Sequence, residues 1–159
     1  MAVTSSITHL KISDKAPAIK AYDQEGKLFQ LKDIKGKKTA LYFYPNDDTE
    51  TCVKEACNLR DNYQMLLKKG YEVIGVSHAP VASKKKFAEK YQLPFRLLSD
   101  PDLKICKEYG VFGDKLFMGK IIQTIHRITF IIDETGKIEK IIHRVKSGEA
   151  ALQIIGIVS

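Results

Sequence analysis

Two cysteines that lie close together, Cys52 and Cys57, are the residues of this sequence best suited to carry chemistry. The chain of 159 residues holds one more cysteine, Cys106. Three unevenly spaced cysteines are too few for a scaffold built on disulfides. In a chain expected to be cytoplasmic, a close pair of cysteines indicates either a metal site or thiol redox chemistry.

Zinc is the metal that such a pair would hold. The gap between Cys52 and Cys57 is possible for zinc, but a structural zinc site needs four ligands. His9, His78 and His143 show no ligand spacing relative to the cysteines. Redox chemistry is therefore favoured, with no metal and no other cofactor. A zinc-binding or redox-sensing module remains the alternative.

The expected position of Cys52 favours its thiolate form. Residues 39–44 (TALYFY) are a continuous apolar run, as in a strand buried on both faces, and Pro45 ends it because proline cannot donate to a sheet. Apolar residues then recur at helical spacing from Ala56, so Cys52 is expected where a loop passes into a helix. The free N–H groups and partial positive charge of a helix start stabilise a thiolate, the nucleophilic form.

A proline and a threonine stand at informative positions before Cys52. Pro45 lies seven residues and Thr49 three residues before it, in the pattern P-x-x-x-T-x-x-C, which resembles that of peroxiredoxins. The resemblance implies that the proline stiffens the loop and shields the thiolate from water. It also implies that the threonine hydroxyl donates a hydrogen bond to a peroxide while accepting another, which orients the O–O bond for in-line attack.

The resemblance to peroxiredoxins extends over residues 8–145. The segments that carry it are LYFYPNDDTETCVKEACNLRD, KKFAEKYQLPF, LLSDPDLKICKEYGV and IHRITFIIDETGKIEKII. They are similar to the Q-type peroxiredoxins, also called bacterioferritin comigratory proteins. The resemblance implies a thioredoxin-like fold, no metal, and reduction of hydrogen peroxide and organic hydroperoxides at Cys52.

The same resemblance assigns roles to two charged residues. It places Arg127 beside the active loop, where a guanidinium can hydrogen-bond the thiolate and stabilise charge on the departing peroxide oxygen. Glu55, three residues after Cys52, matches a family glutamate that holds this arginine. From the residues alone, a surface-paired arginine and a simple exposed helix glutamate remain the alternatives.

Cys57 stands at the spacing of the resolving cysteine in many Q-type members. In an ideal helix the Cα atoms of Cys52 and Cys57 would be roughly 8.6 Å apart, whereas a disulfide usually needs about 4.4–6.8 Å. We therefore expect the first helical turns to unwind after Cys52 becomes a sulfenic acid, so that Cys57 can attack it. Thioredoxin or another dithiol would restore both thiols. The alternative for Cys57 is a small core residue.

The sequence departs from the family in front of Cys52. Many relatives have Pro-Gly between the threonine and the cysteine, where this chain has Glu50-Thr51, and Val53 replaces a frequent threonine. Other peroxiredoxins tolerate residues other than glycine at this place, so we do not interpret the change as a loss of activity. Cys106, among apolar residues of a later helix, is interpreted as a buried inert thiol.

Helices and strands alternate along the chain, which predicts an α/β fold. The prediction is one thioredoxin-like domain over residues 1–159, with an N-terminal β-hairpin extension within residues 1–38 and a central mixed sheet flanked by helices. Phe117 and Met118 are expected in a loop that covers the peroxide pocket. The predicted strands span residues 39–44, 71–77, 95–98 and 127–132, and the last of these is expected to pair with residues 137–145. One predicted helix runs from the cysteine loop to Gly70, and a second spans residues 81–91. A third runs from the cap Asp100-Pro101-Asp102 to residue 109, and the last begins at Gly148.

The net charge of +7, from 26 Lys+Arg against 19 Asp+Glu, adds a nucleic-acid-binding protein as a third alternative. The lysines are spread along the chain, and the one tight run, Lys84-Lys85-Lys86, is expected on a solvated helix face. Without an aromatic-basic signature no nucleic-acid partner is expected. No segment approaches the roughly 18 apolar residues of a membrane span, so no membrane partner is expected either. We expect a cytoplasmic monomer or weak homodimer.

Overall fold

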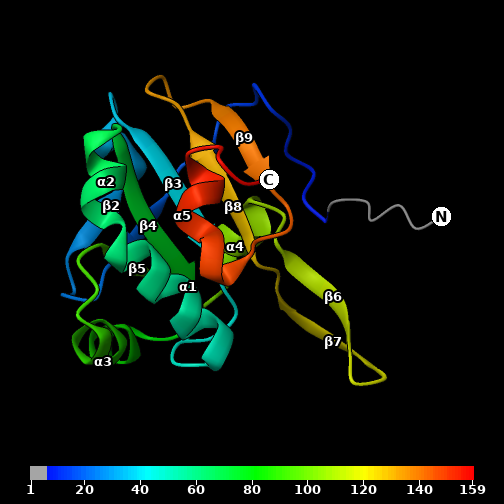
Figure 1. Ribbon diagram of the computed structural model, residues 1–159. Coiled ribbons are helices and arrows are strands. Elements are labelled where there is room, and N and C mark those ends of the chain that lie inside the picture. The colour runs from blue at the N-terminus through cyan, green and yellow to red at the C-terminus, as the bar shows by residue number, and fades with distance from the viewer. Residues whose placement is uncertain (1–6) are drawn as a thin grey trace.

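The computed structural model describes residues 7–159, in which a seven-stranded sheet carries helices on both faces (Figure 1). The first six residues of the predicted N-terminal region 1–38 lie outside the described residues. The strands of this sheet, in chain order, are β1 (Lys20–Tyr22), β2 (Leu28–Gln30), β3 (Lys38–Phe43), β4 (Tyr71–Ser77), β5 (Arg96–Ser99), β8 (Ile128–Ile132) and β9 (Ile138–Ile142). The α-helices are α1 (Glu50–Asp61), α2 (Tyr63–Lys68), α3 (Val81–Tyr91), α4 (Lys104–Glu108) and α5 (Ala150–Ile154). From residue 7 onward, no helix is long and apolar enough to cross a membrane.

Parallel pairing forms the centre of the sheet, and antiparallel pairing forms its flanks. The strands lie in the order β2-β1-β5-β4-β3-β8-β9. β4 runs parallel to both β3 and β5, whereas β8 is antiparallel to β3 and β1 is antiparallel to β5. β1 and β2 form the predicted N-terminal hairpin, and β8 and β9 form the predicted closing hairpin. The mixed sheet with flanking helices confirms the predicted α/β, thioredoxin-like class.

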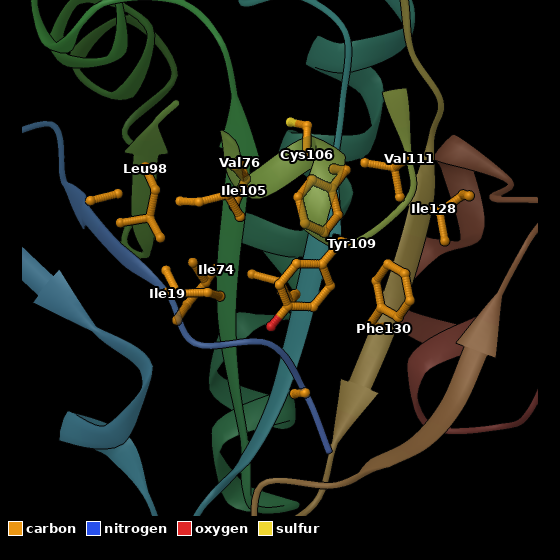
Figure 2. Close-up of a cluster of buried hydrophobic side chains, with 14 of the residues drawn as sticks. Ile19, Ile74, Val76, Leu98, Ile105, Cys106, Tyr109, Val111, Ile128 and Phe130 are labelled. Carbon is orange, nitrogen blue, oxygen red and sulfur yellow. The ribbon is translucent and has the colours of Figure 1, made fainter. Parts of the chain in front are cut away.

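Side chains alternate along the central strands between two buried layers. In β3, Leu41 and Phe43 belong to one layer, and Ala40 and Tyr42 belong to the other. The first layer packs against α4 and includes Phe130 of β8 (Figure 2). The second layer packs against α1, α2, α3 and α5. Burial on both faces explains why β3 is continuously apolar rather than alternating.

The helix predicted from the cysteine loop to Gly70 is wrong as one element, because it breaks at Asn62 into α1 and α2. The side-chain amide of Asn62 donates to the carbonyl of Asn58 at 2.8 Å, beside the bond from its own backbone N–H at 3.2 Å. An asparagine side chain that bonds the preceding turn in this way competes with continuation of the helix. The predicted bounds of β4 and α3 are confirmed.

The start of α4 also differs from the prediction, in which Pro101 opens the helix. The helix begins only after Leu103, whose backbone is left-handed with φ 62°. Asp100 still caps it, because its two carboxylate oxygens accept the backbone N–H groups of Ile105 and Cys106 at 3.1 and 2.8 Å. The predicted N-cap position and first turn are therefore wrong, because Leu103 is the N-cap residue, although the Asp100 side chain does bind N–H groups of the first turn.

A second hairpin, β6 (Phe112–Phe117) and β7 (Lys120–Ile125), is absent from the prediction and projects from the body of the molecule (Figure 1). Met118 and Gly119 both have positive φ, 51° and 80°, as in a two-residue type I′ turn. The prediction of a loop is therefore wrong for Phe117, which ends β6, whereas Met118 lies in the turn. Their side chains are 53% and 87% exposed at the hairpin tip.

Candidate active site

Cys52 lies in the first turn of α1, after the loop that follows β3. Its side chain is only 2% exposed. The buried residues of α1 are Cys52, Glu55, Ala56 and Leu59, a spacing that places all four on one face of the helix. Packing of this face against the second core layer therefore holds the sulfur in place at the start of the helix.

Arg127 contacts the sulfur from the neighbouring strand. Phe43, at the end of β3, pairs with Ile128, at the start of β8, so the loop after β3 and the residue before β8 meet at the same edge of the sheet. The guanidinium Nη2 of Arg127 donates to Cys52 Sγ at 3.3 Å. A guanidinium stays protonated in proteins, so a permanent cation lies within hydrogen-bond distance of the Cys52 sulfur.

The second arm of the same guanidinium binds Glu55. Nη1 of Arg127 donates to Glu55 Oε1 at 2.9 Å, and the Glu55 side chain has no exposed surface. Burial raises the pKa of Glu55 from 4.5 to about 7, although the charge and hydrogen bond of Arg127 oppose the rise. Glu55 Oε2 and the Tyr42 hydroxyl are buried without a hydrogen-bond partner. Glu55 is thus placed to orient Arg127 and to change charge near neutral pH.

Thr49 and Pro45 both lie on the loop that leads into α1. Thr49 is the N-cap residue of α1, directly before its first turn, and its side chain makes no capping hydrogen bond. Thr49 is exposed and precedes Cys52 by three residues in the sequence. Pro45 is half-buried and follows the last buried tyrosine of the strand, Tyr44.

Cys57 lies on α1 itself and is half-buried. The helix is continuous from Glu50 to Asp61, so several turns of intact helix contain both cysteines. All three cysteines carry free thiols in this structure. A bond between Cys52 and Cys57 therefore requires a local change in α1.

Cys106 lies in the other core layer, on the opposite face of the sheet (Figure 2). Its side chain has no exposed surface. Burial, together with the nearby carboxylate of Asp100, raises the pKa of the Cys106 thiol far above its usual range. A thiol that stays protonated and is inaccessible cannot act as a nucleophile at neutral pH.

The prediction that Lys84 lies on a solvated helix face is wrong. The Lys84-Lys85-Lys86 run does not form one solvated face, because Lys84 is completely buried whereas the other two lysines are exposed. Its ammonium group forms an ion pair at 3.0 Å with Asp47, a residue of the loop between Pro45 and Cys52. The signal available in the sequence was the helical spacing of Lys84 to the apolar pair Phe87-Ala88, which shares its buried face.

Across residues 7–159 no group of three or more His, Cys, Asp or Glu side chains is arranged to hold a metal ion. The chemistry that this arrangement supports is that of a cysteine nucleophile beside a guanidinium at the start of a helix.

This chain is similar to known proteins both in sequence and in fold. The chain matches the AhpC/TSA family over residues 12–141. Peroxiredoxin Bcp of Escherichia coli (strain K12) is 46% identical over 132 residues, which cover 83% of this chain and 85% of that protein. A peroxiredoxin Q of Xylella fastidiosa, crystallised as a cysteine-to-serine mutant, has a TM-score of 0.86 at 27% identity and covers 94% of this chain and 96% of its own.

A bacterioferritin comigratory protein of Xanthomonas campestris, studied for its alkyl peroxide reduction activity, has a TM-score of 0.83 at 25% identity. That match covers 94% of this chain and 96% of the other. The resemblance proposed from the motifs around Cys52 is thereby confirmed at the level of the family. The chain belongs to the AhpC/TSA family and, within it, to the Bcp or Q-type peroxiredoxins, which are thiol peroxidases.

Proposed function

We propose that this chain reduces hydrogen peroxide and organic hydroperoxides through a sulfenic acid formed on Cys52. The observation that carries the proposal is the 3.3 Å hydrogen bond from Arg127 to the Cys52 sulfur. This contact keeps a cation beside the buried thiol of Cys52, which lies in the first turn of the 12-residue helix α1. The alkyl peroxide reduction studied in the Xanthomonas campestris relative supports the same class of substrate.

The first step breaks the O–O bond of the peroxide. The Cys52 thiolate attacks one oxygen, and the other oxygen leaves as hydroxide or alkoxide, which takes up a proton to become water or an alcohol. The sulfur is oxidised to a sulfenic acid and the peroxide is reduced. Arg127 stabilises the charge on the departing oxygen, Thr49 orients the peroxide, and Pro45 shields the sulfur from water.

The second step forms a disulfide. The Cys57 sulfur attacks the sulfenic sulfur of Cys52, the S–O bond breaks, and the oxygen leaves as water. Local unwinding of α1 brings the two sulfurs together. Thioredoxin or a similar dithiol then reduces the disulfide by exchange and is itself oxidised.

We also propose the setting in which this cycle operates. A thioredoxin-type reductant is available in the cytoplasm, where thiols are kept reduced, so a cytoplasmic enzyme fits the chemistry. The chain would act as a single domain over residues 1–159, as a monomer or weak homodimer, with no nucleic-acid or membrane partner. Light scattering during size-exclusion chromatography of the reduced protein distinguishes monomer and dimer from any larger assembly, which would contradict this proposal.

A peroxidase assay coupled to thioredoxin tests the two cysteine roles. We expect Cys52→Ser to be inactive and Cys57→Ser to turn over once before it stalls or is overoxidised. Cys106→Ala is the control and should retain turnover, because this thiol is buried on the far face of the sheet. Turnover by Cys52→Ser would contradict the function, and peroxide-treated wild-type protein without a Cys52–Cys57 bridge in mass spectrometry would contradict the resolving role.

A further inference from the structure

The active-site loop is anchored to α3 by a buried ion pair that the peroxidase mechanism does not use. The Lys84 side chain has no exposed surface, and that of Asp47 is 6% exposed. Lys84 Nζ lies 3.0 Å from Asp47 Oδ1 and donates to the Tyr44 hydroxyl at 2.9 Å and to the Ser77 hydroxyl. All three protons of the ammonium group therefore have acceptors, as a buried cation requires.

Asp47 is held as completely as the lysine. Its Oδ1 also accepts the Tyr44 hydroxyl at 2.7 Å, and its Oδ2 accepts the hydroxyl of Ser83 at 2.7 Å. Ser83 and Lys84 are neighbours on α3, so two adjacent side chains of this helix hold one loop carboxylate. Removal of one partner from a buried, satisfied pair leaves the other charge uncompensated, which makes such a contact a strong positional constraint.

The next loop residue is bound to the same helix. Asp48 accepts hydrogen bonds from Lys90 Nζ at 2.9 Å and from the Tyr91 hydroxyl at 2.7 Å. Its backbone is left-handed, with φ 60°, which is unfavourable for a residue other than glycine unless its surroundings impose it. Thr49 follows at once, and α1 begins at Glu50. The loop is thus fixed to α3 as far as Asp48, and only Thr49 separates this anchor from α1.

We propose that Lys84 is a positioning residue of the peroxidase reaction, which holds Asp47 and the loop from Pro45 to Asp48 against α3. In the reduced state this anchor sets the position of Thr49 and of the first turn that carries Cys52. During disulfide formation it ends the unwinding of α1 at Asp48, so that the loop keeps its shape and the site re-forms after reduction. This inference rests on the proposed function.

Lys84→Met tests the anchor, because methionine fills a similar volume without the charge. We expect the rate constant for oxidation of Cys52 by hydrogen peroxide to fall about tenfold or more, as a displacement near 1 Å at a reacting centre can cost that much. The rate of the subsequent Cys52–Cys57 bond formation, followed by rapid quenching and mass spectrometry, should not fall, because it needs α1 and not α3. Lys86→Met, an exposed lysine of the same run, is the matched control and should behave as wild type.

Asp47→Asn and the double variant separate positioning from a direct charge effect on Cys52. If Lys84 acts through Asp47, each single variant slows Cys52 oxidation and the double variant is no slower than Lys84→Met. If Lys84 acted on the sulfur by its charge alone, Asp47→Asn would oxidise faster than wild type, because a negative charge would be removed. That second result would overturn the proposal.

Ser83→Ala keeps the test decisive if Lys84→Met does not fold cooperatively. It removes one hydrogen bond to Asp47 from a half-buried position, and we expect Cys52 oxidation to slow at least about threefold. Oxidation at the wild-type rate in every variant that folds would overturn the proposal. A wild-type protein without peroxidase activity would instead contradict the proposed function, so the two failures are distinguishable.

Discussion

At the scale of single residues, Arg127 hydrogen-bonds both the Glu55 carboxylate and the Cys52 sulfur through its guanidinium. Glu55 Oε1 lies 2.9 Å from one arm, and Cys52 Sγ lies 3.3 Å from the other. Glu55 has no exposed surface, so the orientation of the arginine depends on a carboxylate that is costly to ionise. The charge on Glu55 therefore connects pH to the geometry around Cys52.

Glu55→Gln tests this connection. Below about pH 7 the wild-type Glu55 gains a proton and loses its ion pair with Arg127, so Cys52 oxidation should slow as pH falls through 7. Glutamine cannot ionise, so the variant should be on the order of tenfold slower at pH 8 and should lack this part of the pH profile. Stopped-flow rates from pH 5.5 to 8.5 provide the measurement, and identical profile shapes for the two proteins would refute the role of Glu55.

The same ionisation affects stability, with a defined sign. The pKa of Glu55 in the folded protein, about 7, lies above its ordinary value of 4.5, so between these values the folded state retains a proton that the unfolded state has lost. The stabilisation that this proton provides is complete below the unfolded pKa and is lost as pH rises through 7. Urea unfolding should therefore show a steeper loss of stability from pH 5 to pH 8 in the wild type than in Glu55→Gln.

At the scale of elements, α1 holds Cys52 in place in the reduced state but must unwind in the proposed second step. In the reduced state its buried face holds Cys52 beside Arg127. In the proposed second step the same helix must unwind, because its regular geometry keeps Cys52 and Cys57 too far apart for a disulfide. The stability of the first turns of α1 should therefore set the rate of resolution.

Two substitutions of Lys54 test this expectation. Lys54 is exposed and lies between the two cysteines on α1. Glycine costs about 1 kcal/mol more than alanine in a helix, so Lys54→Gly should form the disulfide about fivefold faster than Lys54→Ala. Quenched samples analysed by mass spectrometry would give both rates. Equal rates would show that α1 does not limit resolution.

At the scale of the whole molecule, the sheet separates two cores and aligns the site at one edge. The antiparallel pairing of β3 with β8 brings the end of one strand beside the start of the other, which places the cysteine loop next to Arg127. α1, α2, α3 and α5 cover one face, whereas α4 covers the other. Cys52 and Cys106 thereby lie in different layers, on opposite faces of the sheet.

Separate layers predict independent contributions to stability. Leu66 and Phe130 are both fully buried, in the second and the first layer respectively. We expect Leu66→Ala to cost about 2–5 kcal/mol and Phe130→Ala about 3–5 kcal/mol in free energy of unfolding. The double variant should differ from the sum by no more than about 0.5 kcal/mol in urea unfolding. A larger deviation would mean that the sheet transmits strain between the two layers.

The predicted elements were most accurate where one local signal defined them. β4 and α3 have the predicted bounds, because a buried apolar strand and a periodic helix are each recognisable without their neighbours. The hairpin of β6 and β7 was missed because its turn, Met118-Gly119, lacks the asparagine or aspartate that usually marks such turns. The break at Asn62 was missed because it depends on a side-chain bond rather than on periodicity.

The candidate nucleophile and the family could be predicted from the sequence, because Pro45, Thr49, Cys52 and Cys57 lie together in one short segment with a recognisable order. The surroundings of the sulfur depend on contacts between distant segments, of which the family resemblance predicted that of Arg127 but nothing in the sequence predicted that of Lys84. Arg127 reaches Cys52 across a sequence separation of 75 residues, and Lys84 reaches the cysteine loop at Asp47 across 37. Pairing of strands and packing of α3 create these contacts, and a charged side chain carries no local sign of whether a distant partner will bury it.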